Sequence, residues 1–180
     1  VSICDREKLR REAFLLQKFS YPGIPCAVEL LESGTKSFLV MEAVNGKSIG
    51  QRMRKGERFS SREILKTGIA LSGILCYLHA QNPPVFYRDL KPENIRIRVD
   101  GRAGILDLGC LWNREQDWSG AGNRSFSAPE QFVPGEIPGE ESDVYAVGRL
   151  LADMLGDDTD GTVRQSGGIR RRNAEKRCGR

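Results

Sequence analysis

Apolar residues recur at helical spacing in three stretches of the chain. Residues 5–19 place apolar side chains on one face and charges on the other. Residues 60–80 form a longer apolar stripe, with Ser60 or Ser61 in position to cap it. A third stretch covers residues 143–155. The pattern predicts a helix over each stretch.

Short runs of strand-like composition lie between these helices. Residues 26–31 and 37–44 form one pair, and residues 95–99 and 103–106 form another, each pair joined by a glycine-containing turn signal. Residues 110–140 are irregular and rich in Gly, Ser and Pro. A helix, a small sheet and a mostly helical remainder indicate the α+β fold class.

Composition describes an ordinary soluble domain. The 180 residues are 39% hydrophobic and 29% charged, and the longest apolar runs are far too short to span a bilayer. No secretory leader pattern opens the sequence. The five cysteines are odd in number and form no C-x-x-C pair, so a reducing compartment fits best. We expect a cytoplasmic protein with no membrane segment in these residues.

The net charge of +4 is concentrated at one end of the sequence. Residues 157–180 hold seven Arg or Lys and four Asp or Glu, a net +3, which leaves +1 for residues 1–156. Because the body is nearly neutral, no basic face for nucleic acid is expected. The Gly- and Arg-rich end itself is predicted to be a basic, disordered tail.

The residues that carry chemistry lie between the second and third helices. They are Tyr87-Arg88-Asp89-Leu90-Lys91-Pro92-Glu93-Asn94, followed by Asp107-Leu108-Gly109. Asp89 can accept the proton of an attacking hydroxyl, and Lys91, two residues on, can lie beside a transferring phosphate. Asn94 and Asp107 supply the hard oxygen ligands that Mg²⁺ prefers. The hairpin between them can bring both to one metal.

This arrangement resembles the protein kinase family. The family's H-R-D-L-K-x-x-N loop stands here as Y-R-D-L-K-P-E-N, and its D-F-G as D-L-G. Ala128-Pro129-Glu130 matches the A-P-E triplet, and Asp143-Val-Tyr-Ala-Val-Gly148 resembles the D-x-W-x-x-G that opens a central helix. Together with the hinge-like residues Met41 to Val44, these are five ordered motifs at family-like spacing, which is a specific signal.

The resemblance implies ATP and Mg²⁺ as cofactors and a protein substrate. By this resemblance, the lysine at position 91 of the loop is the residue typical of the family's serine/threonine kinases. Met41, Glu42 and Val44 resemble the hinge that meets adenine, with Met41 as gatekeeper and Glu42 and Val44 offering backbone groups. Glu12 resembles the helix glutamate that precedes the hinge strands.

Several residues take regulatory roles by the same resemblance. Arg88 is similar to the arginine that receives an activation-loop phosphate, and Ser119 and Ser125 are candidate phosphorylation sites. Glu130 resembles the glutamate that anchors the end of the activation segment. His79, the sole histidine of the sequence, is interpreted as a hydrogen-bonded structural residue.

The resemblance divides the chain and also shows where it departs from the family. Residues 1–44 are predicted to be a remnant of the N-lobe, 45–156 the C-lobe up to its central helix, and 157–180 the tail. Only eleven residues precede Glu12, too few for the family's Gly-rich loop and strand lysine. We therefore expect residues 1–180 alone to be inactive and to aggregate. A pseudokinase or partner-docking module stays open as the alternative. Sequence preceding residue 1 would discriminate between these readings.

Overall fold

The computed structural model describes residues 3–34, 36–108, 111 and 123–156. Their helices and strands, in chain order, are α1 (Ile3–Lys18), β1 (Ala27–Ser33), β2 (Lys36–Met41), β3 (Lys47–Ser48), α2 (Ile49–Arg54), α3 (Ser61–His79), the 3₁₀ helix η1 (Pro92–Asn94), β4 (Ile95–Ile97), β5 (Ala103–Ile105), the 3₁₀ helix η2 (Pro129–Phe132) and α4 (Glu140–Leu155).

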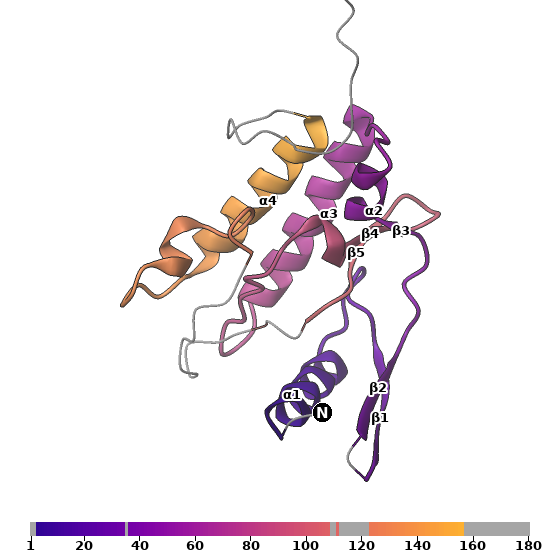
Figure 1. The fold of residues 1–180 in the computed structure, drawn as a ribbon, viewed down its shortest axis with the longest axis vertical. Helices are drawn as coiled ribbons and strands as arrows, with labels where there is room; N and C mark the ends of the chain where they lie inside the picture. The colour runs from indigo at the N-terminus through magenta and orange to yellow at the C-terminus, as the bar shows by residue number, and fades with distance from the viewer. Residues whose placement is uncertain (1–2, 35, 109–110, 112–122, 157–180) are drawn as a thin grey trace, which may run out of the picture.

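The elements gather into two neighbouring groups (Figure 1). Helix α1 packs beside the antiparallel β1–β2 hairpin, in which Ser33 pairs with Lys36 next to the turn. Helices α3 and α4 run side by side, and the three-stranded sheet in the order β3-β4-β5 lies next to α2 and α3. The predicted α+β class is confirmed, whereas the predicted boundary near residue 44 stays a prediction.

The three predicted helices are present. Ser60 caps α3: its hydroxyl accepts from the Glu63 N–H, and the Glu63 carboxylate accepts from the Ser60 N–H. This reciprocal pair satisfies two N–H groups that a helix start leaves open. Helix α4 begins at Glu140, three residues before its predicted start, because acidic residues at its first turn favour the helix N-terminus.

The second strand is shorter than predicted. Strand β2 ends at Met41, and the expectation that it continues to Val44 is wrong. Pro25, opposite this end, has no N–H to donate. The N–H of Ile24, which would extend the ladder, donates instead to the Tyr21 carbonyl at 3.0 Å. The chain from 42 to 46 is therefore free to run on as an irregular link.

Two elements of residues 47–54 escaped the sequence pattern. Strand β3 has only two residues, and α2 has six, of which Ile49 and Gly50 are buried. Such short elements show too few turns for a periodicity to appear. Their local signal is the capping pair of Ser48 and Gln51, in which each side chain bonds the other's backbone N–H.

One apolar core joins the two groups. Helix α3 contributes Leu71, Ile74, Leu75 and Leu78, and the same cluster includes residues of α1, β4, β5 and α4. Full burial of each such side chain contributes about 1.5–3 kcal/mol. The core thus ties α1 to β4 and β5, the two strands that lie between the chemical motifs in the sequence.

Gly23 fixes the crossing between the two groups. Its carbonyl accepts the Ile105 N–H at 2.9 Å, and its φ is +94°. A Cβ there would lie 2.8 Å from the Ala103 carbonyl oxygen and 2.9 Å from the Ile74 Cδ1. Only glycine meets both demands, so the turn after α1 is fastened to β5.

Some of the apolar surface of α3 and α4 is open. Leu65, Ile69 and Leu155 are each at least 60% exposed, so these members of the predicted apolar stripe lie outside the core. None of the helices in the described ranges combines the length and apolar character needed to cross a bilayer. Cys26 and Cys76 are free thiols at exposed positions.

Candidate active site

The loop after α3 takes a strained turn at Arg88. Arg88 has φ = +64°, and the Asp89 N–H donates to the Tyr87 carbonyl at 2.9 Å, which closes a γ-turn. Such backbone strain in a non-glycine residue persists only where neighbours hold it. The turn points Asp89 away from the preceding helix and into the loop that ends in η1.

Asp89, Lys91 and Asn94 meet in this loop. The Lys91 Nζ lies 2.5 Å from Asp89 Oδ2, and the Asn94 amide nitrogen donates to the Asp89 carbonyl at 3.2 Å and to Oδ2 at 3.3 Å. The Asp89 side chain is only 10% exposed. Both side-chain contacts end on Oδ2, so the open edge of the carboxylate is Oδ1. Because Asn94 uses its nitrogen on Asp89, its amide oxygen is the atom left to face a ligand.

Strand β5 delivers Asp107 to the same loop. The Leu106 N–H donates to the Asn94 carbonyl at 2.8 Å, and the Tyr87 phenol donates to the Asp107 carbonyl at 2.8 Å. Both ends of the β4–β5 hairpin are thus joined beside Asp89. Asp89, Lys91 and Asn94 thus lie in contact, and the buried Tyr87 fastens the backbone of Asp107 to the same loop.

Glu12 reaches the same motif from α1. Its Oε1 accepts the Leu108 N–H at 3.3 Å. Burial raises the pKa of the Glu12 carboxyl; the Leu108 N–H opposes this shift, and the nearby Asp107 charge adds to it. A carboxylate from the first helix therefore stands directly beside the residue that follows Asp107.

Asp143 is a site residue whose role the sequence did not indicate. It is fully buried at the start of α4 and accepts the Tyr87 N–H at 2.8 Å and the Arg88 N–H at 2.7 Å. His79 bonds the same carboxylate at 2.8 Å, which confirms its interpretation as a hydrogen-bonded structural residue. The motif at 143–148 was the available signal, but it does not reveal the partners. Asp143 therefore holds the backbone of the strained turn in place.

Gln131 is a second residue that sequence reasoning missed. Its side-chain nitrogen donates to the Arg88 carbonyl at 3.1 Å, and its oxygen accepts the Ala128 N–H at 3.2 Å. It is buried, and it adjoins Glu130, whose Oε1 accepts the Ser142 hydroxyl at 2.7 Å. The Ala-Pro-Glu segment is therefore bonded both to the catalytic loop and to α4.

The remaining regulatory candidates divide between described and undescribed residues. The Arg88 side chain is buried next to Asp89. Ser125 is exposed, and its N–H donates to the Asn123 side chain at 2.9 Å. Ser119 lies outside the described residues. Their roles as phosphate receiver and phosphorylation sites stay predictions.

The hinge candidates lie at the end of β2 and just after it. Met41 is half-buried against the core, and Glu42 and Val44 follow it. The Glu42 N–H donates to Cys26, and the Val44 carbonyl accepts from Arg96 at 3.2 Å. Within the described part of the chain, the Glu42 carbonyl and the Val44 N–H have no backbone partner. Both groups are therefore available to a ligand.

Comparison with known proteins decides the family. The sequence profile of the protein kinase domain matches residues 2–168. The chain belongs to the protein kinase domain family. The family explains why Asp89, Lys91, Asn94 and Asp107 meet, and it confirms the resemblance derived from the five motifs.

Relatives of this kinase domain occur in animals and plants. The chain is 31% identical over 148 residues to sperm motility kinase 3A of Mus musculus, covering 80% of this chain and 29% of the relative. It is 27% identical over 166 residues to CBL-interacting serine/threonine-protein kinase 9 of Arabidopsis thaliana, covering 84% and 37%. It is 31% identical over 160 residues to serine/threonine-protein kinase WNK of Caenorhabditis elegans, covering 84% and 8%. The kinase domain thus spans well under half the length of each relative.

The donor set of the kinase domain fits magnesium carried by a nucleotide. Among the described residues, no group of three or more His, Cys, Asp or Glu side chains could hold a metal ion on its own. Asn94 and Asp107 supply one amide oxygen and one carboxylate. Mg²⁺ usually takes one or two protein oxygens and completes its shell with phosphates and water. The residues present therefore fit Mg²⁺ that arrives with phosphate.

Proposed function

We propose that this chain carries the catalytic centre of a protein serine/threonine kinase, which transfers the γ-phosphate of ATP to a hydroxyl of a protein substrate. The observation that carries the proposal is the convergence of Asp89, Lys91 and Asn94 in one loop, with Asp107 delivered beside them by β5. Several relatives are serine/threonine-protein kinases by name, which supports the choice of substrate hydroxyl.

Asp89 is the group that takes the proton. Its carboxylate is buried on one side and held by Lys91 and Asn94, so its open edge is oriented before a substrate arrives. Lys91 stands at the same carboxylate, where its ammonium can also offset charge on the phosphate that moves. Transfer gives the hydroxyl oxygen a new bond to phosphorus, leaves ADP, and places the hydroxyl proton on Asp89.

Asn94 and Asp107 are the residues that would hold Mg²⁺. Bound there, the metal supplies positive charge to the phosphate oxygens. The adenine would meet the Glu42 carbonyl and the Val44 N–H, neither of which has a hydrogen-bond partner among the described residues. Met41 lies at the end of β2 directly before them.

Regulation and location belong to the same proposal. A phosphate on Ser119 or Ser125 would be drawn to the buried guanidinium of Arg88. A cytoplasmic location is proposed because Cys26 and Cys76 are free thiols at exposed positions, which suits a reducing compartment.

The test is phosphate transfer by the purified full-length protein that contains residues 1–180, because these residues alone are expected to be inactive. Incubated with γ-labelled ATP, Mg²⁺ and a mixture of protein substrates, it is expected to give labelled phosphoserine or phosphothreonine. Asp89→Asn removes the proton acceptor and is expected to lower the rate about 10²–10⁴-fold. Asp100→Asn makes the same change on the exposed β4–β5 turn and is expected to leave the rate unchanged.

Two outcomes would overturn this assignment. If Asp89→Asn transferred phosphate as fast as the unaltered protein, Asp89 would not be the proton acceptor. Absence of transfer by the unaltered protein, with nucleotide binding retained, would favour the pseudokinase alternative.

A further inference from the structure

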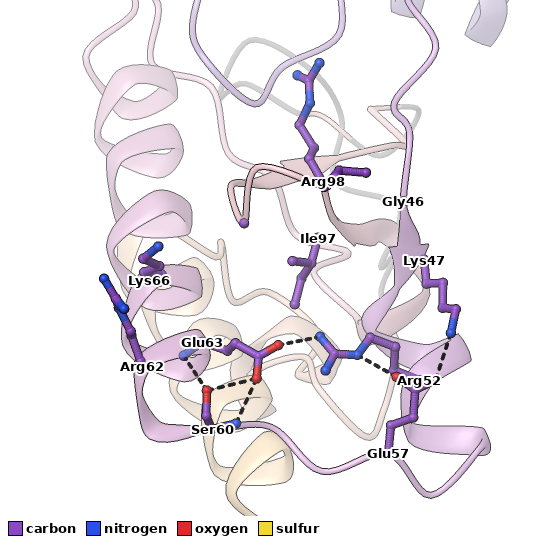
Figure 2. Close-up of a pocket in the computed structure, with 12 residues that line it drawn as sticks. Gly46, Lys47, Arg52, Glu57, Ser60, Arg62, Glu63, Lys66, Ile97 and Arg98 are labelled. Carbon is purple, nitrogen blue, oxygen red and sulfur yellow. Dashed lines mark hydrogen bonds and ion pairs between the residues drawn. The ribbon is translucent and has the colours of Figure 1, made fainter.

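Figure 2 shows a pocket of about 540 Å³ on the part of the molecule where β3, α2 and α3 meet. Four segments line it: the start of β3, helix α2 with the link that follows it, the first turns of α3, and the closed end of the β4–β5 hairpin. None of Asp89, Lys91, Asn94 or Asp107 contributes to its lining. The volume is that of a site for a ligand several side chains in size.

The lining carries an excess of positive charge. Five cations (Lys47, Arg52, Arg62, Lys66 and Arg98) stand against two acids (Glu57 and Glu63), which is a net +3. The whole chain carries only +4, and residues 157–180 account for most of that. The pocket is therefore a local concentration of charge on an almost neutral body.

The two acids of the pocket are already occupied. Arg52 bridges both: it lies 3.0 Å from Glu57 and 2.9 Å from Glu63, and its guanidinium sits over the Phe59 ring at 4.3 Å. Lys47 also pairs with Glu57 at 3.0 Å. Side-chain hydrogen bonds, with Lys47 foremost, lower the pKa of the Glu57 carboxyl. These pairs form a fixed wall of the pocket.

Arg62 and Lys66 are the cations left to a ligand. Neither forms an ion pair or side-chain hydrogen bond within the described ranges of the chain, and Figure 2 shows both on the α3 side of the pocket, one helical turn apart. Arg98 is directed away from Arg62 and Lys66 in Figure 2, and it pairs with Glu42 at 3.2 Å. A ligand in the pocket would therefore meet Arg62 and Lys66 first.

The lining also includes two apolar side chains. Ile97 and Val99 line the pocket, and Val99 is 96% exposed. Gly46 allows β3 to lie directly on β4: its φ is +114°, and a Cβ there would fall 2.1 Å from the Ile97 carbonyl oxygen. A ligand that matches this pocket therefore carries negative charges beside an apolar group.

The β4–β5 hairpin connects the pocket to the catalytic residues. Its open end holds Asn94 and leads to Asp107, whereas its closed end supplies Val99 and Gly101 to the pocket. Arg98, on the same strand link, also pairs with the hinge residue Glu42. A segment bound in the pocket would lie on the element that carries the two metal-binding candidates.

We propose that this pocket docks an acidic peptide segment of the protein substrate, with glutamate or aspartate at Arg62 and Lys66 and an apolar side chain on Val99. The proposal rests on the proposed kinase function for the identity of the partner, but not for the binding itself. A nucleic acid fits less well, because no aromatic side chain lines the pocket to stack on a base.

The test is direct binding of a fluorescein-labelled glutamate-rich peptide containing leucine, measured by fluorescence anisotropy on the purified protein. Saturable binding is expected, and the same peptide with glutamine for glutamate is expected to bind at least about tenfold more weakly. Arg62→Glu with Lys66→Glu is expected to weaken binding by a similar factor. The milder pair Arg62→Gln and Lys66→Gln should weaken it less and guards against misfolding.

Lys36→Glu is the matched control. Lys36 is exposed on β2, outside the pocket, and its reversal changes the net charge as each pocket substitution does. It is expected to leave the affinity within about twofold. Equal weakening by Lys36→Glu would show diffuse attraction and overturn the docking site.

Other results would also overturn the proposal. One is that the glutamate and glutamine peptides bind with equal affinity. Another is that a single-stranded oligonucleotide binds more tightly than the glutamate peptide and loses affinity in the same Arg62 and Lys66 variants. Asp89→Asn is expected to retain peptide binding while losing phosphate transfer. Failure of docking and failure of the kinase assignment are thereby measured separately.

Discussion

Asp89 shows how one side chain becomes available for chemistry. Its carboxylate would be an ordinary surface charge if the backbone at Arg88 were relaxed. The γ-turn turns it toward Lys91 and Asn94, and the N–H groups that the turn leaves open go to Asp143. The proposed proton acceptor therefore depends on a buried acid, Asp143, that holds the loop backbone.

The role of Asp143 gives a prediction at this scale. Asp143→Asn keeps the shape but offers one acceptor where Tyr87 and Arg88 present two N–H groups. A buried donor left without a partner costs about 1–3 kcal/mol. Urea unfolding is expected to show a loss of that size, together with a lower rate of phosphate transfer.

Glu141→Gln is the control for this change. Glu141 precedes Asp143 by two residues in α4 and is exposed, so its substitution is expected to change neither quantity. If Asp143→Asn kept both the parent stability and the parent rate, Asp143 would not position the loop.

Functional residues could be predicted from the sequence where they lie close together in one motif. Asp89, Lys91 and Asn94 lie within six positions of one another, and their residue types match the needs of phosphate transfer. Asp143 lies 55 positions from Arg88 and bonds only its backbone. No side-chain pattern records such a contact, so the sequence could name the motif but not its partner.

At the scale of elements, the first turn of α3 is the best-defined start of a helix. Its cap joins Ser60, Glu63 and Arg52, so it serves the helix and the basic pocket together. The Ser60 N–H, followed by the Arg52 guanidinium and the Ser60 hydroxyl, lowers the pKa of the Glu63 carboxyl.

This shift predicts a pH dependence of stability. A lowered pKa means that the folded chain favours the ionised carboxylate, so its contribution is present above the ordinary pKa of about 4.5 and is lost as the pH falls through the folded value. Glu63→Gln is expected to be less stable than the parent at neutral pH and equal to it at low pH. Urea midpoints measured across that range check this.

A matched change on another helix is Glu7→Gln, at an exposed position of α1. It is expected to leave the midpoint at neutral pH unchanged. A constant difference between Glu63→Gln and the parent at every pH would contradict the electrostatic explanation and indicate lost packing.

Elements were predictable in proportion to their length. The nineteen residues of α3 repeat the apolar period several times, whereas the six residues of α2 do not complete two turns. The end of β2 was misplaced because the sequence of residues 42–44 is compatible with a strand. The turn in which the Ile24 N–H bonds the Tyr21 carbonyl removes the backbone with which those residues would pair. Pairing decided the boundary.

At the scale of the whole molecule, the sequence predicted the α+β class and the family, and the pocket lay beyond its reach. The cations of the pocket come from four segments between residues 46 and 101, so their proximity arises only on folding. The open apolar side of α3, at Leu65 and Ile69, also appears only in three dimensions. Periodicity shows that a helix has an apolar face, but it does not show how much of that face the neighbouring elements cover.

The central claim is that side chains from the catalytic loop and from the end of β5 share one magnesium–nucleotide site. A double-mutant cycle on the affinity for ATP tests it most directly, with Asn94→Ala, Asp107→Ala and the pair measured by calorimetry in Mg²⁺ and in chelator. If both residues hold one ion, each change weakens binding in Mg²⁺, and the pair departs from additivity by at least about 0.5 kcal/mol. Effects that add within about 0.3 kcal/mol, or that persist unchanged in chelator, would contradict the shared site.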